Sequence, residues 1–158
     1  MVDATPAAVV RALVDAGLTI ASGESLTAGL VAATLAEVPG CSVVLRGGVI
    51  AYQRDVKAGV LGVPAEALAA GLVSREVAVA MATGAARVLG ADIGVGTTGV
   101  AGPDPHDGQP AGTVWVAVAG PRGVSARRLA LQGDREEIRR ATVAACWPLV
   151  LEQCLPGE

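Results

Sequence analysis

Serine 25 is the side chain whose position points first to chemistry. It follows an apolar run that predicts a buried strand (residues 18–21) and precedes a charge-poor run that predicts a helix (residues 30–35). A serine at such a turn has two interpretations. As an N-cap, its hydroxyl accepts hydrogen bonds from the first N–H groups of the helix. As a nucleophile, it lies beside N–H groups and a helix dipole that stabilise an oxyanion. The spacing alone favours the cap.

A nucleophilic Ser25 needs a base, and the sequence offers few candidates. His106 is the only histidine, and it lies among Pro, Asp and Gly residues that are typical of an exposed turn. Nearly all other basic residues are Arg, which does not deprotonate. Lys57 is therefore a candidate, because burial among its apolar sequence neighbours would lower its pKa. The alternative is a surface lysine on a short helix.

Two glycine motifs have both a structural and a functional interpretation. Gly47-Gly48 interrupts an apolar run (residues 43–52) that predicts a strand, which indicates either a bulge or the close approach of a ligand. Residues 94–99 spell GxGxxG, but a Gly- and Pro-rich loop follows instead of a helix, and no acid lies between Asp107 and Asp134. A dinucleotide-binding fold is therefore not expected. A turn that binds an anion through backbone N–H groups is the better functional interpretation.

Composition restricts the class of protein. The 158 residues are 52% hydrophobic but only 2% aromatic, with no Phe, so the core must consist of Ala, Val, Leu and Ile. A net charge of −3 argues against nonspecific nucleic-acid binding. Half of the basic residues nevertheless lie in the last quarter of the chain, as a solvated surface or as an anion site. They are Arg122, Arg127, Arg128, Arg135, Arg139 and Arg140.

Cysteine usage and hydropathy predict a soluble cytoplasmic protein. Three cysteines without metal-ligand spacing indicate reduced thiols. The N-terminus lacks the basic start of a signal peptide, and no uncharged apolar run approaches the roughly 18 residues that span a bilayer.

Capping residues define an alternation of helices and strands. Thr5-Pro6 predicts a helix start, Gly17 its end, Ser74 the cap of the longest amphipathic helix, and Asp134 the start of the last helix. The predicted helices cover residues 7–16, 30–35, 53–60, 64–68, 75–89 and 134–151, and the predicted strands cover residues 18–21, 43–52, 91–95, 113–119 and 124–131. This order favours an α/β layered fold in one domain.

Five segments, in order along nearly the whole chain, resemble the CinA C-terminal domain family. They are Glu24-Ser25-Leu26-Thr27-Ala28-Gly29, Gly47-Gly48-Val49-Ile50-Ala51-Tyr52 with Lys57, Thr98-Gly99-Val100-Ala101-Gly102-Pro103, Gly112-Thr113-Val114 and Gly133-Asp134-Arg135. Characterised members are nicotinamide mononucleotide deamidases. The resemblance therefore implies a Ser/Lys amidohydrolase that produces nicotinate mononucleotide and ammonia.

The resemblance also implies a fold, partners and roles for residues. It implies a three-layer α/β/α sandwich around a mixed sheet, with one domain over residues 1–158, usually dimeric and without metal or cofactor. The expected partner is a small nucleotide substrate, with neither nucleic acid nor membrane. We expect a stand-alone version, because the nucleotide pyrophosphatase domain of longer CinA proteins would need an N-terminal extension.

Individual roles carry over to matching positions. Ser25 matches the family's nucleophile, Lys57 its general base and Tyr52 the tyrosine that supports them. The segments expected to shape the substrate pocket contain Glu24, Thr27, Gly47, Gly48, Thr98, Gly99 and Arg135.

The turn after Ser25 departs from the family. Members most often have Glu-Ser-Cys-Thr-Gly-Gly, whereas this chain has Leu26 and Ala28. If the family's glycine needs a positive φ, Ala28 destabilises the turn; if the position is helical, Ala is harmless. Two alternatives to the deamidase follow: a nucleotide- or partner-binding module without catalysis, linked to competence or DNA damage, and an amidase for another small amide.

Overall fold

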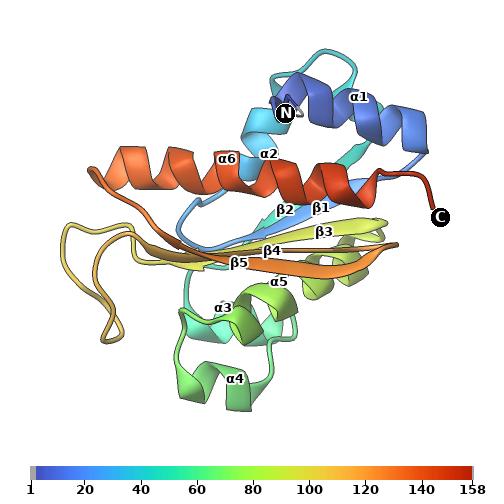
Figure 1. Cartoon of the computed structure of the whole chain (residues 1–158). Helices are drawn as coiled ribbons and strands as arrows, with labels where there is room; N and C mark the ends of the chain where they lie inside the picture. Colours follow the sequence, from blue (N-terminus) through green and yellow to red (C-terminus); the bar gives the residue numbers. More distant parts are fainter. Residues whose placement is uncertain (1–2, 158) are drawn as a thin grey trace.

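A five-stranded mixed sheet lies between two layers of helices in the computed structural model, which describes residues 3–157 (Figure 1). The strands are β1 (Ile20–Glu24), β2 (Leu45–Ile50), β3 (Ile93–Gly99), β4 (Thr113–Gly120) and β5 (Gly123–Ala130). Their spatial order is β2-β1-β3-β4-β5. β1 pairs in parallel with β2 and β3, whereas β4 is antiparallel to β3 and β5. The predicted three-layer α/β fold in a single domain is confirmed.

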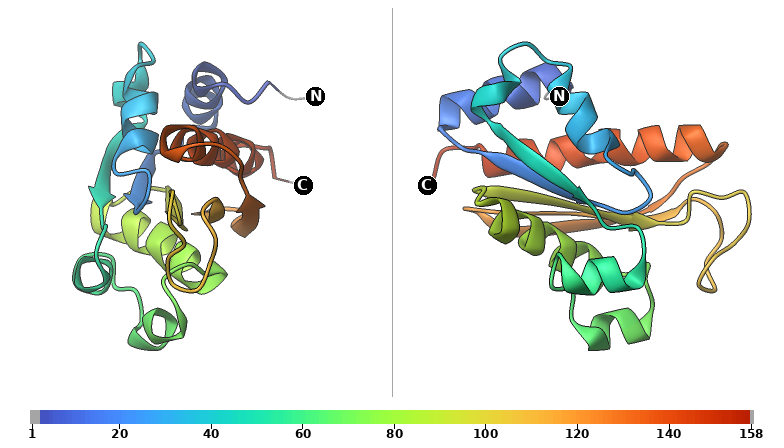
Figure 2. Two further views of the ribbon diagram at one scale, coloured as in Figure 1. Left: turned by 90° about the vertical axis from the view of Figure 1, so that its left-hand side faces the viewer. Right: turned by 180° about the vertical axis from the view of Figure 1, so that it is seen from behind.

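The helices divide between the two faces of the sheet (Figure 2). One face carries α1 (Pro6–Ala16), α2 (Leu30–Ala36) and α6 (Arg135–Gln153). The other carries α3 (Arg54–Gly59), α4 (Ala65–Ala70) and α5 (Arg75–Leu89), and a 3₁₀ turn, η1 (Cys41–Val43), precedes β2. None of the helices within residues 3–157 has both the length and the apolar character needed to cross a bilayer.

The predicted capping residues act as caps. Thr5 Oγ1 accepts a hydrogen bond from the Ala8 N–H, and Ser74 Oγ accepts one from the Val77 N–H. Asp134 forms a reciprocal capping box with Glu137. These contacts satisfy N–H groups that the helices themselves leave unpaired, so local sequence fixes where α1, α5 and α6 begin.

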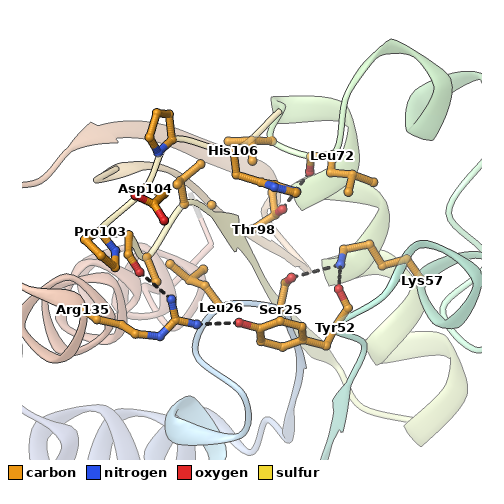
Figure 3. Close-up of a pocket in the computed structure, with 16 residues that line it drawn as sticks. Ser25, Leu26, Tyr52, Lys57, Leu72, Thr98, Pro103, Asp104, His106 and Arg135 are labelled. Atoms are coloured by element: carbon orange, nitrogen blue, oxygen red, sulfur yellow. Dashed lines mark hydrogen bonds between the residues drawn. The ribbon is translucent and has the colours of Figure 1, made fainter. Parts of the chain in front are cut away.

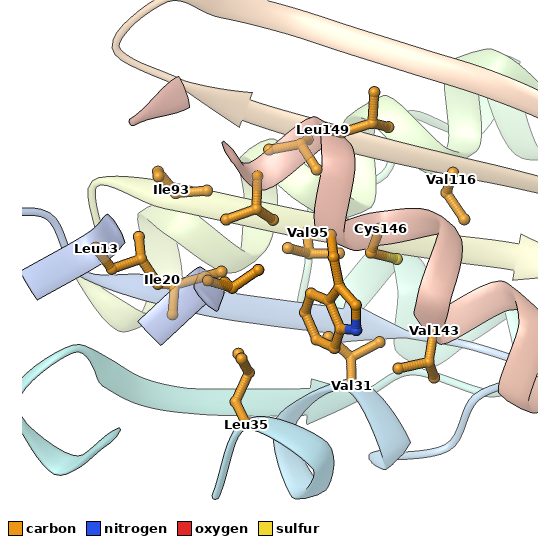
Figure 4. Packing of buried hydrophobic residues seen from close by; sticks show 14 of the residues in the cluster. Leu13, Ile20, Val31, Leu35, Ile93, Val95, Val116, Val143, Cys146 and Leu149 are labelled. Carbon is orange, nitrogen blue, oxygen red and sulfur yellow. The ribbon is translucent and has the colours of Figure 1, made fainter. Parts of the chain in front are cut away.

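Branched aliphatic side chains fill the space between the sheet and the α1–α2–α6 layer (Figure 4). Val143, Cys146 and Leu149 of α6 pack in one cluster with Ile20 of β1 and Val95 of β3. Trp147 is 2% exposed and is the aromatic member of this core. All three cysteines are free thiols.

The GxGxxG run is part of β3 and not an anion-binding turn. Its backbone pairs with β1 on one side and β4 on the other, so its N–H groups serve the sheet. A Cβ at Gly94 would collide with the Ala82 carbonyl oxygen, and one at Gly96 with the Ala78 carbonyl oxygen. The glycines are needed because α5 lies directly against this strand. The prediction of an anion-binding turn at residues 94–99 was wrong. A strand at this position is consistent with the expectation that the run is not a dinucleotide-binding motif.

The glycine pair in β2 marks a bulge. Ile20 pairs with Leu45, but the next residue of β1 pairs with Gly47, so the register shifts by one residue on β2. A Cβ at Gly48 would lie 2.6 Å from Ser22 Oγ. The close approach at this pair thus comes from a side chain of β1, and the bulge interpretation is confirmed.

We expect the same glycine-to-alanine change to have opposite effects at two positions. Gly94→Ala should lower the free energy of unfolding by about 1–3 kcal/mol, because the new methyl group overpacks the contact between β3 and α5. Gly59→Ala should raise it by up to about 1 kcal/mol, because this helical residue has open space around its Cα. Urea unfolding of both variants measures the two changes. Equal changes in the free energy of unfolding would show that close packing of β3 on α5 is not the reason for glycine at position 94.

Candidate active site

A cavity of about 460 Å³ opens where the carboxyl ends of the three parallel strands meet (Figure 3). In open α/β sheets, ligands bind at this edge. Three strand ends contribute to it: Ser25 follows β1, Tyr52 follows β2, and Thr98 and Gly99 end β3. The remaining lining residues are Leu26, Lys57, Leu72, Val73, Val100, Ala101, Gly102, Pro103, Asp104, Pro105, His106 and Arg135.

Ser25 and Lys57 form a hydrogen-bonded pair at the base of this cavity. Lys57 Nζ lies 2.9 Å from Ser25 Oγ, although 32 residues separate them in the chain. Lys57 Nζ also donates to the carbonyl oxygens of Ala51 (2.9 Å) and Tyr52 (2.7 Å). Ser25 is 8% exposed and Lys57, the only lysine in the chain, is 1% exposed. The two residues have the geometry of a nucleophile and its base.

Burial lowers the pKa of Lys57 from 10.5 to about 8. Removing an ammonium from water disfavours its charged form, and the three groups within hydrogen-bond distance of Nζ are neutral oxygens. A neutral amine has two N–H donors and one lone pair. With both N–H groups directed at the Ala51 and Tyr52 carbonyl oxygens, the lone pair is left for the Ser25 hydroxyl proton.

Ser25 is not the N-cap of α2, so the interpretation that spacing favoured was wrong. The N-cap position is Gly29, which has no side chain. Glu24 takes over the capping function: its Oε1 accepts from the Val31 N–H (2.8 Å) and its Oε2 from the Ala32 N–H (3.2 Å). A carboxylate binds these N–H groups more strongly than a hydroxyl does, which leaves the Ser25 hydroxyl for Lys57.

Glu24 and Thr27 support the turn and do not line the cavity. Glu24 is fully buried, and its carboxylate also accepts from Ser22 Oγ (2.8 Å) and Thr27 Oγ1 (2.7 Å). Thr27 Oγ1 in turn contacts Thr97 Oγ1 at 2.8 Å. We therefore do not propose that Glu24 and Thr27 bind substrate, because their side-chain oxygens already form hydrogen bonds inside the protein.

Gly47 and Gly48 also lie outside the cavity lining. Both are residues of β2, one pairing with Ala21 and the other with Ser22 of β1. Their position in the bulged part of the sheet explains the glycines, so we do not propose that they bind substrate.

Tyr52 and Arg135 form one side of the cavity mouth (Figure 3). Arg135 Nη2 donates to Tyr52 Oη at 2.9 Å, and its Nη1 donates to the Gly102 carbonyl oxygen. Of the six C-terminal arginines, Arg135 is the one that lines the cavity. Arg127 and Arg140 pair on the surface with Glu152 and Glu136. The solvated-surface interpretation thus applies to these two, and Arg135 fits the anion-site interpretation.

Another wall of the cavity comes from the loop after β3, of which the family resemblance placed only residues 100–103 in a segment that shapes the pocket. Residues 100–112 extend beyond the end of β3 (Figure 1). Asp107 Oδ2 accepts from the Leu72 N–H (2.6 Å), and Gln109 Nε2 donates to the Val73 carbonyl oxygen (3.2 Å). Thr98 Oγ1 donates to the Leu72 carbonyl oxygen. These bonds place His106, an exposed turn residue as predicted, at the rim of the cavity.

Within residues 3–157, no group of three or more His, Cys, Asp or Glu side chains is arranged to hold a metal ion.

Comparisons with known proteins point to one family. The CinA C-terminal domain model matches residues 2–154. A protein of Desulforamulus reducens described as competence-damage inducible is 52% identical over 134 residues, which are 84% of this chain and 33% of that protein. A CinA-like protein of Frankia casuarinae is 45% identical over 94% of this chain and 34% of its own length.

Solved structures give the same result. A competence-damaged protein (CinA) superfamily protein from Klebsiella pneumoniae matches with a TM-score of 0.89 and 33% identity, over 96% of this chain and 94% of that chain. The chain therefore belongs to the CinA C-terminal domain family. It spans about a third of the length of the curated relatives it matches.

The two residues at which the chain departs from the family lie in different environments. Leu26 is 2% exposed and joins the core cluster, so its side chain is accommodated by packing. Ala28 has φ 48°, which is the left-handed region. A Cβ in this conformation costs roughly 1–2 kcal/mol. Of the two alternatives for position 28, the positive φ therefore applies, and glycine would be more stable there than alanine.

We expect Ala28→Gly to raise the free energy of unfolding by about 1 kcal/mol. The relief of backbone strain in the folded state should outweigh the greater conformational entropy that glycine gives the unfolded chain. Ala33→Gly, at an exposed position inside α2, is the matched control and should lower it by about 1 kcal/mol. Thermal unfolding measures both. Destabilisation by Ala28→Gly would contradict a strained turn.

Proposed function

We propose that this protein is a nicotinamide mononucleotide deamidase, which hydrolyses the carboxamide to give nicotinate mononucleotide and ammonia. The observation that carries the proposal is the buried pair of Ser25 and Lys57, with 2.9 Å between Oγ and Nζ at the base of the cavity. Membership of the CinA C-terminal domain family supports it. The choice of substrate follows from the family resemblance and from the chemistry of the site.

In the proposed reaction, Ser25 Oγ attacks the amide carbon while neutral Lys57 accepts the hydroxyl proton. The resulting ammonium of Lys57 still has three acceptors for its three protons, because Ala51, Tyr52 and Ser25 each offer an oxygen. Lys57 then protonates the amine as the C–N bond breaks, which releases ammonia and leaves an ester on Ser25. Lys57 next takes a proton from water as the water attacks the ester. It then returns that proton to Ser25 Oγ as the C–O bond breaks, which releases nicotinate mononucleotide and restores both residues.

The oxyanion requires N–H donors, and the first turn of α2 does not supply them, because Glu24 binds the Val31 and Ala32 N–H groups. The backbone N–H of Leu26 is the better candidate. It follows the nucleophile directly, Leu26 borders the cavity, and this N–H has no acceptor among residues 3–157. A donor in this position is the arrangement that stabilises a tetrahedral intermediate in other serine hydrolases.

Charge and polarity fit a pyridine nucleotide with a phosphate group. Arg135 supplies a guanidinium at the cavity mouth for the phosphate. Apolar side chains of Leu72, Val73 and Val100 line the wall and suit a flat aromatic ring. Tyr52 joins both regions, since its hydroxyl accepts from Arg135 and its carbonyl oxygen from Lys57.

We expect the purified protein to release ammonia from nicotinamide mononucleotide, and Ser25→Ala and Lys57→Met each to lower the rate by about 100-fold or more. Each variant removes one partner of the proton transfer. Ser42→Ala is the matched control, because Ser42 is exposed and lies in η1, outside the cavity lining. Circular dichroism and thermal unfolding show whether each variant folds.

Two outcomes would contradict the proposal. Binding of the mononucleotide without ammonia release, unchanged in Lys57→Met, would favour a binding module. Release of ammonia from another amide, together with none from the mononucleotide, would leave the dyad in place but assign a different substrate.

We also expect the rate to rise with pH because Lys57 must be neutral to accept the proton. With a pKa of about 8, roughly a tenth of Lys57 is neutral at pH 7 and roughly nine tenths at pH 9. kcat/KM should therefore increase almost tenfold for each pH unit below about pH 7 and level off above about pH 9. Steady-state rates from pH 6 to 10 test this, and a flat profile over that range would exclude Lys57 as the base.

A further inference from the structure

Arg139 binds the backbone of the nucleophile turn from outside the cavity. It lies on α6, one helical turn after Arg135, and is absent from the cavity lining. Its Nε donates to the Leu26 carbonyl oxygen (2.9 Å) and its Nη2 to the Thr27 carbonyl oxygen (3.0 Å). One planar guanidinium thus holds the carbonyls of the two residues that follow Ser25.

These two bonds fix the orientation of peptide groups. In a trans peptide, the C=O and the N–H of the next residue point in opposite directions. The guanidinium therefore also determines where the N–H groups of Thr27 and Ala28 point. The Ala28 N–H donates to the Ser25 carbonyl oxygen at 3.0 Å, which closes the turn. The conformation of residues 25–28 is thus tied to a side chain 111 or more positions away in sequence.

The turn needs this external restraint. Ala28 holds a left-handed φ of 48°, which costs free energy that the rest of the structure must offset. Glu24 holds the turn from the side of the sheet through Thr27 Oγ1, and Arg139 holds it from the side of α6. Glu24 binds the side chain of Thr27, whereas Arg139 binds its backbone carbonyl oxygen, which also accepts from the Leu30 N–H at 2.9 Å.

We propose that Arg139 is a positioning residue: it holds Ser25 and the Leu26 N–H in the geometry for acyl transfer without touching the substrate. The proposal rests on the function proposed above for the same site. Loss of the guanidinium should leave substrate binding nearly intact, because Arg135 and the apolar wall remain. It should slow the chemical step, because small displacements of reacting groups have large effects on rate.

The test compares Arg139→Gln and Arg139→Lys with Arg140→Gln. Arg140 is the matched control, because it is adjacent on α6 but pairs with Glu136 on the exposed surface. Two activities are measured. One is turnover of nicotinamide mononucleotide, and the other is the rate at which diisopropyl fluorophosphate phosphorylates Ser25 with loss of fluoride, followed by mass spectrometry from pH 6 to 10. The second needs an activated Ser25 but not the proposed substrate.

We expect Arg139→Gln to lower kcat by about 10- to 100-fold with KM within about threefold of the native value. Phosphorylation of Ser25 by this reagent should slow by a similar factor, with the midpoint of its pH profile unchanged because Lys57 keeps its environment. Arg139→Lys should recover part of the loss, since an ammonium can bind one carbonyl but lacks the planar fork that binds both. Arg140→Gln should match the native protein in both assays.

Different results would overturn different statements. If Arg139→Gln folds and reacts with diisopropyl fluorophosphate at the native rate, the positioning role is wrong, whatever the turnover. A shifted midpoint would mean that Arg139 acts by holding the whole dyad together, which also contradicts the proposal. If diisopropyl fluorophosphate labels the native protein and labels Arg139→Gln slowly, but neither turns over the mononucleotide, the positioning role stands and the proposed substrate fails.

Discussion

The burial of the Lys57 amine is the constraint on which the site depends. A lysine that is 1% exposed must find acceptors for its protons inside the protein. It finds them where β2 ends, in the carbonyl oxygens of Ala51 and Tyr52. The Ala51 N–H donates to the Glu24 carbonyl oxygen at 2.8 Å, which ties this segment to the end of β1. The parallel pairing of β1 and β2 thus places an amine and a hydroxyl from different parts of the chain within hydrogen-bond distance.

A second constraint is the competition for the N–H groups at the start of α2. Ser25 and Glu24 are neighbours, and both side chains carry oxygen atoms that can accept hydrogen bonds from N–H groups. Because Glu24 points into the protein and binds Val31 and Ala32, the serine is released from a structural role. The buried carboxylate is tolerated because it accepts four hydrogen bonds, two from backbone and two from hydroxyl groups. Glu24 thus caps the helix, and the adjacent Ser25 keeps its hydroxyl beside Lys57 at the cavity.

The sequence predicted most of the fold because its signals are local. Thr5, Ser74 and Asp134 each bind N–H groups within three residues, so the helix starts are readable without tertiary structure. The residues that line the cavity were harder to predict from the sequence. The loop of residues 100–112 joins the site through Asp107 and Gln109, whose partners lie 35 and 36 residues away. Such pairings depend on how β3 and α5 are placed, and no periodicity in one sequence encodes them.

The glycines show why a motif can mislead when its physical cause is not identified. Gly94 and Gly96 match a phosphate-binding fingerprint by spacing, but they are required because α5 backbone lies against β3. Dense packing of α5 requires small residues on both surfaces, and Ala78 and Ala82 supply them from the helix. The close approach of α5 supports the sheet beneath Thr97, whose carbonyl oxygen accepts from the Ser25 N–H. The small residues of β3 therefore contribute to the site through packing, because they fix the strand whose Thr97 carbonyl oxygen binds the Ser25 N–H.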